Sequence, residues 1–219
     1  MPTDQQRRER IQRWIGAPQT GDLNDPETLE ELERDIVGLA DYIAAQATTE
    51  PLSPSPSPFI PADRDFPTTN HYTPNKSGAI RARGVVFHHS CGASLAGDIS
   101  WIKQSRSRVS YHLIIDQDGS RHQFVPFNRR AWHAGKSAFK GRSGCNGFML
   151  GVAFSGDTYD RALTDDEIAS AVDLVAENRD LHGWTLDWMT DHRSVSPGRK
   201  NDLNPREWQR LRNALKAVF

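Results

Sequence analysis

The sequence predicts an α/β fold: a mixed central β-sheet flanked by helices and preceded by a small helical N-terminal segment. Three observations support this prediction. Short β-rich runs at residues 84–90, 110–127 and 148–156 alternate with helical signals, as in a sheet covered by helices. A capping box at residues 164–167 opens a long helix. A Pro/Ser-rich stretch separates this region from the N-terminal helices.

The N-terminal part reads as two helices followed by a linker. The first is expected from Asp4 to Ile15, and the second starts at Asp25-Pro26, an N-cap followed by proline. The stretch PLSPSPSPFIPADRDFP is typical of an extended, semi-rigid linker. We therefore expect a helical segment over 1–48, a linker over 49–68 and the main domain over 69–219. The second helix carries one apolar stripe, made by Leu29, Leu32, Ile36, Leu39 and Ile43.

The main domain has recognisable strand and helix signals in order. GVVFHHS (84–90) and FMLGVAFSG (148–156) read as buried strands, and SYHLIIDQDGSRHQFVPF (110–127) reads as a hairpin around Asp118-Gly119. The box Thr164-Asp-Asp-Glu167 predicts a helix to about His182. Asn204-Pro205 opens a final helix. Its apolar face is formed by Trp208, Leu211, Leu215 and Val218.

Charge and composition limit the classes of function. The net charge is −1, but residues 1–50 hold 5 Lys/Arg and 11 Asp/Glu, whereas residues 51–219 hold 22 and 17. This mild basic excess suits an anionic polymer and lacks the dense basic stripe of a nucleic-acid binder, so no nucleic-acid partner is expected. No apolar run is long enough for stable membrane insertion, and the start, MPTDQQRRERIQRW, has no secretory h-region. We expect synthesis in the cytoplasm without a signal peptide.

Histidines and a carboxylate suggest a metal site. His88 and His89 follow each other on a predicted strand, so they face opposite sides, and only one is expected in a given site. His192 and Asp202 flank a Pro-Gly turn that can fold them together. Two imidazoles and one carboxylate would make a catalytic zinc site, with the fourth position open for water. On spacing alone, solvated or capping roles for the loop residues remain an alternative.

Six ordered motifs make residues 70–218 resemble the type 2 N-acetylmuramoyl-L-alanine amidases. They are VVFHHS, SRVSYHLIIDQDG, FVPFNRRAWHAG, GRSGCNGFMLGVAFSGD, LTDDEI and DHRSVSPGRKND. This family includes phage lysozyme-type amidases, recycling amidases for anhydro-muropeptides and animal peptidoglycan recognition proteins. The stretches around AWHAG and PGRK are most similar to the recycling type.

The resemblance implies a Zn²⁺ cofactor held by His88, His192 and Asp202. It further implies that Lys200 and Tyr111 assist catalysis, Lys200 by stabilising the oxyanion and Tyr111 by orienting the water or binding the same oxyanion. One departure concerns the general base. The recycling type has a Glu where this chain has Ala153, and a small residue where it has Tyr111, so the base is unassigned.

Four further residues have both a functional and a structural interpretation. The resemblance places His133 and Trp132 along the substrate cleft, although His133 can equally be a loop histidine and Trp132 a core residue. His89 is expected to be a packed neighbour, and Cys91 is a weaker ligand candidate than Asp202. Pairing of Cys91 with the second cysteine, at position 145, is left open.

The implied function is hydrolysis of the amide between the lactyl group of N-acetylmuramic acid and L-alanine, in peptidoglycan or a muropeptide. A phage-type endolysin that acts on the cell wall after release is the favoured role. A cytosolic recycling amidase, a non-catalytic recognition module and zinc hydrolysis of another acylated amino sugar or peptide are the alternatives. The N-terminal segment is faintly similar to helical peptidoglycan-binding modules. The alternative is a helical extension that packs on the catalytic domain or mediates assembly. The oligomeric state is left open.

Overall fold

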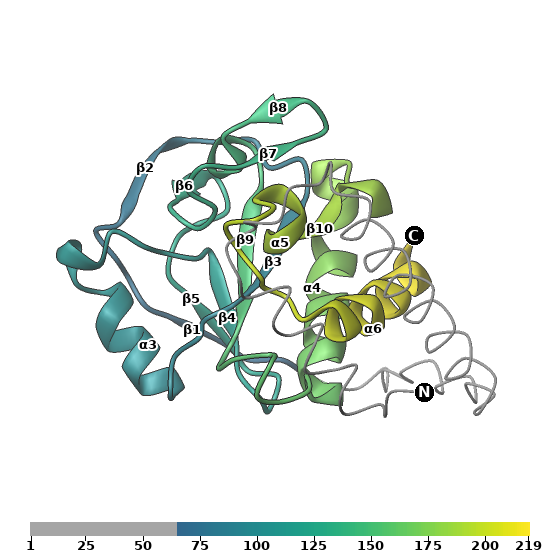
Figure 1. Ribbon diagram of the computed structural model, residues 1–219, viewed down its shortest axis with the longest axis horizontal. Helices are drawn as coiled ribbons and strands as arrows, with labels where there is room; N and C mark the ends of the chain where they lie inside the picture. Colours follow the sequence, from purple (N-terminus) through teal and green to yellow (C-terminus); the bar gives the residue numbers. More distant parts are fainter. Residues whose placement is uncertain (1–64) are drawn as a thin grey trace, which may run out of the picture. The chain divides into compact units, whose positions relative to one another are not determined.

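The computed structural model describes residues 65–219, which form a six-stranded sheet with helices on both sides (Figure 1). The strand order is β1-β5-β4-β9-β3-β10. The bounds are β1 (Thr68–Asn70), β3 (Val85–His89), β4 (Leu113–Ile115), β5 (Arg121–Gln123), β9 (Leu150–Phe154) and β10 (Met189–Asp191).

The sheet is mixed, as the sequence predicts. β4 and β5 pair antiparallel, and the other neighbours in the sheet are parallel. The antiparallel pair is the predicted hairpin, whose turn places Gly119 at φ +82°, a conformation that glycine adopts without strain. β9 and β3 are neighbouring interior strands of the sheet and are fully buried. The β-rich runs at 84–90 and 148–156 are therefore confirmed as buried strands.

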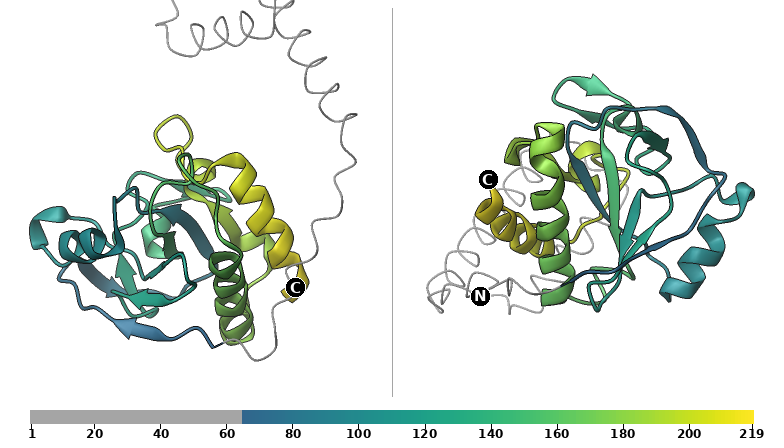
Figure 2. Two further views of the ribbon diagram at one scale, coloured as in Figure 1. Left: turned by 90° about the horizontal axis from the view of Figure 1, so that it is seen from below. Right: turned by 180° about the vertical axis from the view of Figure 1, so that it is seen from behind.

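The helices lie on opposite sides of the sheet. Figures 1 and 2 show α4 (Asp165–His182) and α6 (Pro205–Leu215) on one side and α3 (Leu95–Ile102) on the other. The capping box of α4 is present in full: the Thr164 side chain accepts from the Glu167 N–H, and the Glu167 side chain accepts from the Thr164 N–H. α6 begins after Asn204, whose side chain accepts from the Arg206 N–H. Both predicted helix starts are confirmed.

Alternation along β3 separates the core from the site. Val85 and Phe87 point into the large apolar core beneath α4 and α6, which also contains Val172 and Leu211. Val86 packs on the other face, in a smaller cluster. Because side chains alternate along a strand, His88 shares that second face. The core of the domain thus holds the strand rigidly while leaving His88 on the face without the long helices.

Several short elements carry no clear sequence signal. They are β2 (Lys76–Ala79) paired with β6 (Arg129–Ala131), the hairpin of β7 (Ala138–Phe139) and β8 (Arg142–Ser143), the one-turn helix α5 (His192–Val195), and the 3₁₀ turns η1 (Ser105–Ser107), η2 (Cys145–Gly147), η3 (Leu186–Trp188) and η4 (Lys216–Val218). The β2–β6 pair ends where the motif AWHAG begins. Within the described residues, no helix has both the length and the apolarity needed to cross a membrane.

The expected N-terminal helices and most of the expected linker lie outside the described residues. The described part begins just before Phe66, which is 7% exposed, and Thr68 already pairs with Arg121 in the sheet. The end of the stretch predicted as linker is therefore part of the sheet domain.

Candidate metal centre

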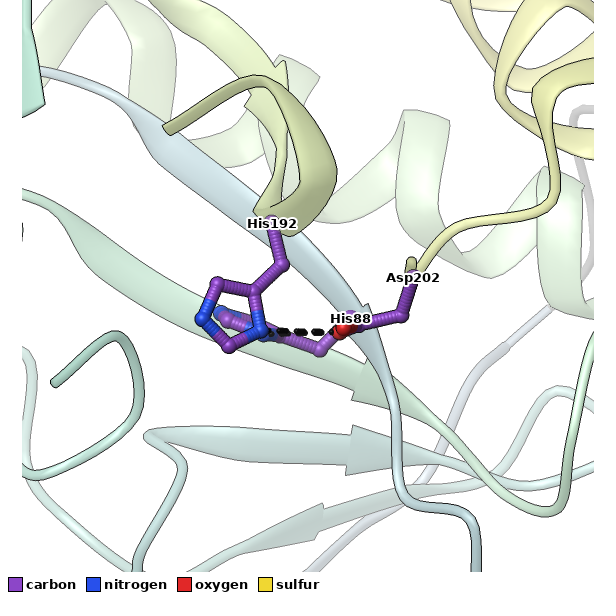
Figure 3. Close-up of side chains that lie close together, drawn as sticks. All are labelled: His88, His192 and Asp202. Atoms are coloured by element: carbon purple, nitrogen blue, oxygen red, sulfur yellow. Dashed lines mark hydrogen bonds and ion pairs between the residues drawn. The ribbon is translucent and has the colours of Figure 1, made fainter. Parts of the chain in front are cut away.

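Three side chains from distant parts of the sequence meet on the face of the sheet opposite α4 and α6 (Figure 3). His88 lies near the end of β3, His192 is the first residue of α5, and Asp202 lies in the segment between α5 and α6. One ligand atom from each lies within 4.8 Å of the others. All three residues are at most 4% exposed. The structure thus brings together the three residues that the resemblance implies as zinc ligands.

Local structure explains why these residues meet. β10 pairs in parallel with β3, with Asp191 opposite Phe87, so the residue after β10 lies beside the end of β3. Asp191 then caps α5 by accepting from the Ser194 N–H, which turns the chain and presents His192. The sequence predicts a loop at His192, whereas in the structure this residue begins a capped turn of helix, which restricts its backbone. The Arg193 N–H donates to the Asp202 carbonyl at 2.6 Å, which draws the later segment back.

The spacing of the donor atoms fits a small metal ion. Nδ1 of His88 lies 3.2 Å and Nδ1 of His192 lies 3.0 Å from Oδ2 of Asp202. Zinc binds imidazole nitrogen and carboxylate oxygen at about 2.0–2.2 Å, so two ligands at tetrahedral positions stand about 3.3–3.6 Å apart. The observed separations are slightly shorter than that edge length, so a small outward shift of the ligand atoms would admit the ion.

The hydrogen-bond partners of the two histidine rings also favour a cation at this point. The carboxylate of Asp202 can only accept, so in the metal-free protein each Nδ1 needs a proton to bond it. Each Nε2, however, faces another acceptor: the Ala134 carbonyl at 3.3 Å for His192, and Nδ1 of His133 at 3.0 Å for His88. A neutral imidazole has one N–H and cannot serve both partners. A metal ion at the meeting point removes this conflict, because both protons then sit on Nε2.

The electrostatics keep the group in the form that binds metal. Burial lowers the pKa of His88 to about 4, although its hydrogen bond to Asp202 opposes the shift. The imidazole is therefore neutral at pH 7. Burial acts to raise the pKa of Asp202, but hydrogen bonds from His192 and His88 outweigh it and hold that pKa well below its usual value. A neutral imidazole, as in His88, and an ionised carboxylate, as in Asp202, are forms in which these side chains bind zinc.

The two expected catalytic helpers lie at different depths. Tyr111 is half-buried just before β4, and its ring lies 5.3 Å from the His88 ring between centroids. Burial raises the pKa of its hydroxyl, and the charge of Asp202 adds to the shift, so the group remains an O–H donor. Lys200 is exposed, two residues before Asp202. Burial mainly lowers the pKa of His89, and the charge of Lys200 contributes to that shift.

The two expected substrate-binding residues also differ. Trp132 is half-buried, donates from its indole to Oγ of Ser77 at 3.2 Å, and lines a pocket of about 450 Å³. Polar and cationic side chains, including Arg130 and Arg142, line the same pocket. His133 is only 5% exposed, and both of its ring nitrogens have partners inside the protein. The substrate contact expected of His133 therefore has no free ring nitrogen to make it.

His89 and Cys91 lie outside the group of three. His89 faces away from His88, and its Nδ1 accepts from the Thr158 N–H at 3.1 Å, so it packs as the sequence suggests. Cys91 is exposed, and its thiol lies 3.6 Å from Asp157. These residues form a second cluster of potential ligands. In this cluster Nδ1 of His89 is engaged by the Thr158 N–H at 3.1 Å and lies 3.2 Å from Oδ1 of Asp157. Both cysteines of the chain are free thiols.

Two residues that fix the loops around the site were missed from the sequence. Oδ1 of Asn146 accepts from the His133 N–H at 3.1 Å and the Ala134 N–H at 2.7 Å. Arg199 donates to the carbonyls of Ala134 at 2.6 Å and Lys136 at 3.0 Å, which ties the segment carrying Asp202 to the AWHAG loop. Both lie in motifs noted in the sequence, GRSGCNG and PGRK, but spacing alone gives no sign of their partners.

Comparison with known proteins identifies relatives over the same region. The family model for N-acetylmuramoyl-L-alanine amidase matches residues 78–206. The chain is 42% identical over 109 residues to the 1,6-anhydro-N-acetylmuramyl-L-alanine amidase AmpD of Salmonella typhimurium, covering 48% of this chain and 56% of that protein. It is 27% identical over 141 residues to the N-acetylmuramoyl-L-alanine amidase XlyB of Bacillus subtilis, covering 63% of this chain and 42% of that protein. The chain thus spans about half the length of these curated relatives.

The fold is shared as well. The crystal structure of a Se-Met AmpD derivative superimposes with a TM-score of 0.55 at 26% identity, covering 68% of this chain and 94% of that one. The family match covers more than half of the chain and includes His88, His192 and Asp202. The chain therefore belongs to the N-acetylmuramoyl-L-alanine amidase family.

Proposed function

We propose that the chain is a zinc-dependent N-acetylmuramoyl-L-alanine amidase. Its substrate would be the amide between the lactyl group of N-acetylmuramic acid and L-alanine. The observation that carries the proposal is the convergence of His88 Nδ1, His192 Nδ1 and Asp202 Oδ2 on one point, with each Nε2 held by a separate acceptor. Such a three-ligand set leaves one position for reacting groups, as catalytic zinc sites do.

The chain's own residues account for the remaining parts of a hydrolysis. When bound, zinc supplies Lewis acidity, which polarises a carbonyl and lowers the pKa of water. Water adds to the lactyl carbonyl carbon, the C–N bond breaks, and the nitrogen of L-alanine leaves with a proton. Tyr111 keeps its phenolic proton and lies beside His88, so it is suited to donate to the developing oxyanion. Lys200 adds a positive charge two residues before Asp202 in the chain.

The general base of the reaction has no carboxylate side chain on β9, because residue 153 is alanine where the recycling type has glutamate. Ala153 lies directly opposite His88 on the neighbouring strand and is fully buried. It is packed among apolar side chains of the cluster around Ile114 and Phe124. No residue of β9 therefore supplies a carboxylate at this position, and we propose that Tyr111 and Lys200 are the polar groups that act on the reacting atoms together with the metal.

The pocket lined by Trp132 suits the peptide part of a muropeptide. It lies next to the AWHAG loop, and Trp132 offers an aromatic wall while Arg130 and Arg142 offer positive charge. A stem peptide carries carboxylates, which arginine binds by paired hydrogen bonds. In this proposal Trp132 remains a substrate-binding residue.

Two physiological substrates are in competition. Intact cell-wall peptidoglycan, cut by a phage-type endolysin, is supported by the presence of both Tyr111 and Lys200. A soluble anhydro-muropeptide is supported by the higher identity to AmpD than to XlyB and by Asp202 as the third ligand. Cytoplasmic synthesis is compatible with both.

The experiment is a digestion of both substrates by the zinc-loaded full chain. Purified sacculi and a soluble anhydro-muropeptide are incubated separately, and products are identified by liquid chromatography and mass spectrometry. A free N-terminal L-alanine and an intact glycan are expected. The ratio of the two rates assigns the substrate. Absence of cleavage of both, in protein that holds one zinc per chain, would favour the non-catalytic recognition module instead.

A further inference from the structure

His133 is buried directly behind the metal group rather than at the surface. It follows β6, and its ring meets that of His88 edge-on, with centroids 5.1 Å apart and an interplanar angle of 84°. Its Nδ1 lies 3.0 Å from Nε2 of His88, and its own Nε2 lies 3.3 Å from the carbonyl oxygen of Met149. The ring thus links a backbone carbonyl on one side to a proposed metal ligand on the other.

The Met149 carbonyl oxygen sets the donor and acceptor in each of these hydrogen bonds. A carbonyl oxygen can only accept, so Nε2 of His133 must carry the proton in the bond to Met149. Nδ1 of the neutral ring then has a lone pair and accepts from Nε2–H of His88. With its proton on Nε2, His88 presents the lone pair of Nδ1 to the place where Asp202 and His192 converge.

Packing against Gly151 and hydrogen bonds from the neighbouring backbone to Asn146 hold the His133 ring in place. A Cβ at Gly151 would lie 2.3 Å from Cγ of His133, so β9 makes room for the ring only because residue 151 has no side chain. The backbone on the other side is held by Asn146, whose side chain accepts the N–H groups of His133 and Ala134. The His133 ring is therefore buried, closely packed and hydrogen-bonded at both nitrogens, so its orientation is fixed.

We propose that His133 is a positioning residue that fixes the tautomer of His88 and thereby the ring atom offered to the metal. It does so without touching substrate or metal. The proposal rests on the metal centre put forward above. Histidine ligands of metals commonly donate their second N–H to a carboxylate, a backbone carbonyl or water. In this chain His192 follows that pattern by facing the Ala134 carbonyl, whereas His88 uses another histidine whose tautomer is itself set by a carbonyl.

The test compares two substitutions of similar size in the full chain, His133→Asn and His133→Leu. Oδ1 of asparagine stands near the place of Nδ1 and can accept from His88, whereas leucine fills the space and accepts nothing. Zinc affinity is measured by competition with a chromophoric chelator. We expect His133→Leu to weaken zinc binding about 10- to 100-fold, the usual effect of losing such a partner, and His133→Asn to restore most of it. His112→Leu is the matched control. His112 is a buried histidine whose ring lies 5.8 Å from that of His133, and its partners are Arg129 and Gly151.

A second readout uses the unaltered protein. Long-range ¹H–¹⁵N NMR of the zinc-loaded chain should show His88 with its proton on Nε2 and His133 with an unprotonated Nδ1. Zinc on Nε2 of His88, or equal losses of affinity in His133→Leu and His112→Leu, would overturn the proposal even if one variant folds poorly. Failure of the proposed function looks different: the unaltered chain would then bind no zinc, or would bind it normally and cleave nothing.

Discussion

Removal of His192 is expected to abolish the stabilisation of the fold by zinc. In the proposed site His192 is one of three ligands, and His192→Ala leaves only His88 and Asp202. A ligand present at 100 times its dissociation constant stabilises a protein by about 2.7 kcal/mol. For a domain of roughly this size, 1 kcal/mol shifts Tm by about 2–4 °C, so zinc should raise the wild-type Tm by about 5–11 °C. In the variant, the zinc-induced shift should fall below about 1 °C.

The metal-free baseline should change only moderately. The Ala134 carbonyl keeps its bond from Arg199 at 2.6 Å, and Asp202 keeps His88 at 3.2 Å, so neither group is left without a partner. The loss of buried contacts should then cost about 1–3 kcal/mol. Scanning calorimetry with and without zinc, alongside elemental analysis, separates the two effects. His182→Ala is the control, since that residue ends α4 on the opposite face of the sheet. An equal zinc-induced shift in His192→Ala and wild type would refute the ligand assignment.

Three further predictions address the mechanism, the domain boundary and acid stability. Tyr111→Phe and Lys200→Ala should retain one zinc but lower kcat about 100- to 1,000-fold with little change in KM, because they act in the transition state; steady-state kinetics showing near-normal turnover would make that residue a bystander. A chain starting at Asp63 should fold and cleave a soluble muropeptide, because it retains the buried Phe66; circular dichroism showing an unfolded product would contradict this. His112 is buried and neutral, and burial lowers its pKa to about 4, below the usual value near 6.5. The unfolded chain therefore binds the additional proton first, so urea unfolding should show stability falling from pH 6.5 to 4, and a flat profile would count against that burial.

Sequence reasoning captured the elements that have strong local signals. The capping box at Thr164 and Glu167 and the proline after Asn204 mark helix starts through interactions within one turn, and the structure has both. The β-rich runs at 84–90 and 148–156 are long enough to be read as buried strands, and Gly119 marks a hairpin turn. In each case the physics that forms the element acts between residues close in the sequence.

What could not be predicted depends on contacts between distant residues. β1 and β10 have three residues each and exist because they pair with β5 and β3, so their own sequences carry little signal. The meeting of His88 with Asp202 spans 114 positions and was inferred from family resemblance rather than from geometry. The burial of His133 could not be foreseen either, because it depends on the missing side chain at Gly151 on another strand.

The placement of the three proposed ligands also has a consequence for the order of events during biosynthesis. His88 lies on a central strand, but β10, which carries the chain to His192, is an edge strand that joins last, and Asp202 lies 114 positions after His88. At synthesis rates of about 5–20 residues per second, roughly 6–23 s separate the first ligand from the third. A nascent chain can therefore assemble most of its sheet while it still lacks a complete metal site. In the proposed site, metal loading would then wait until synthesis has passed Asp202.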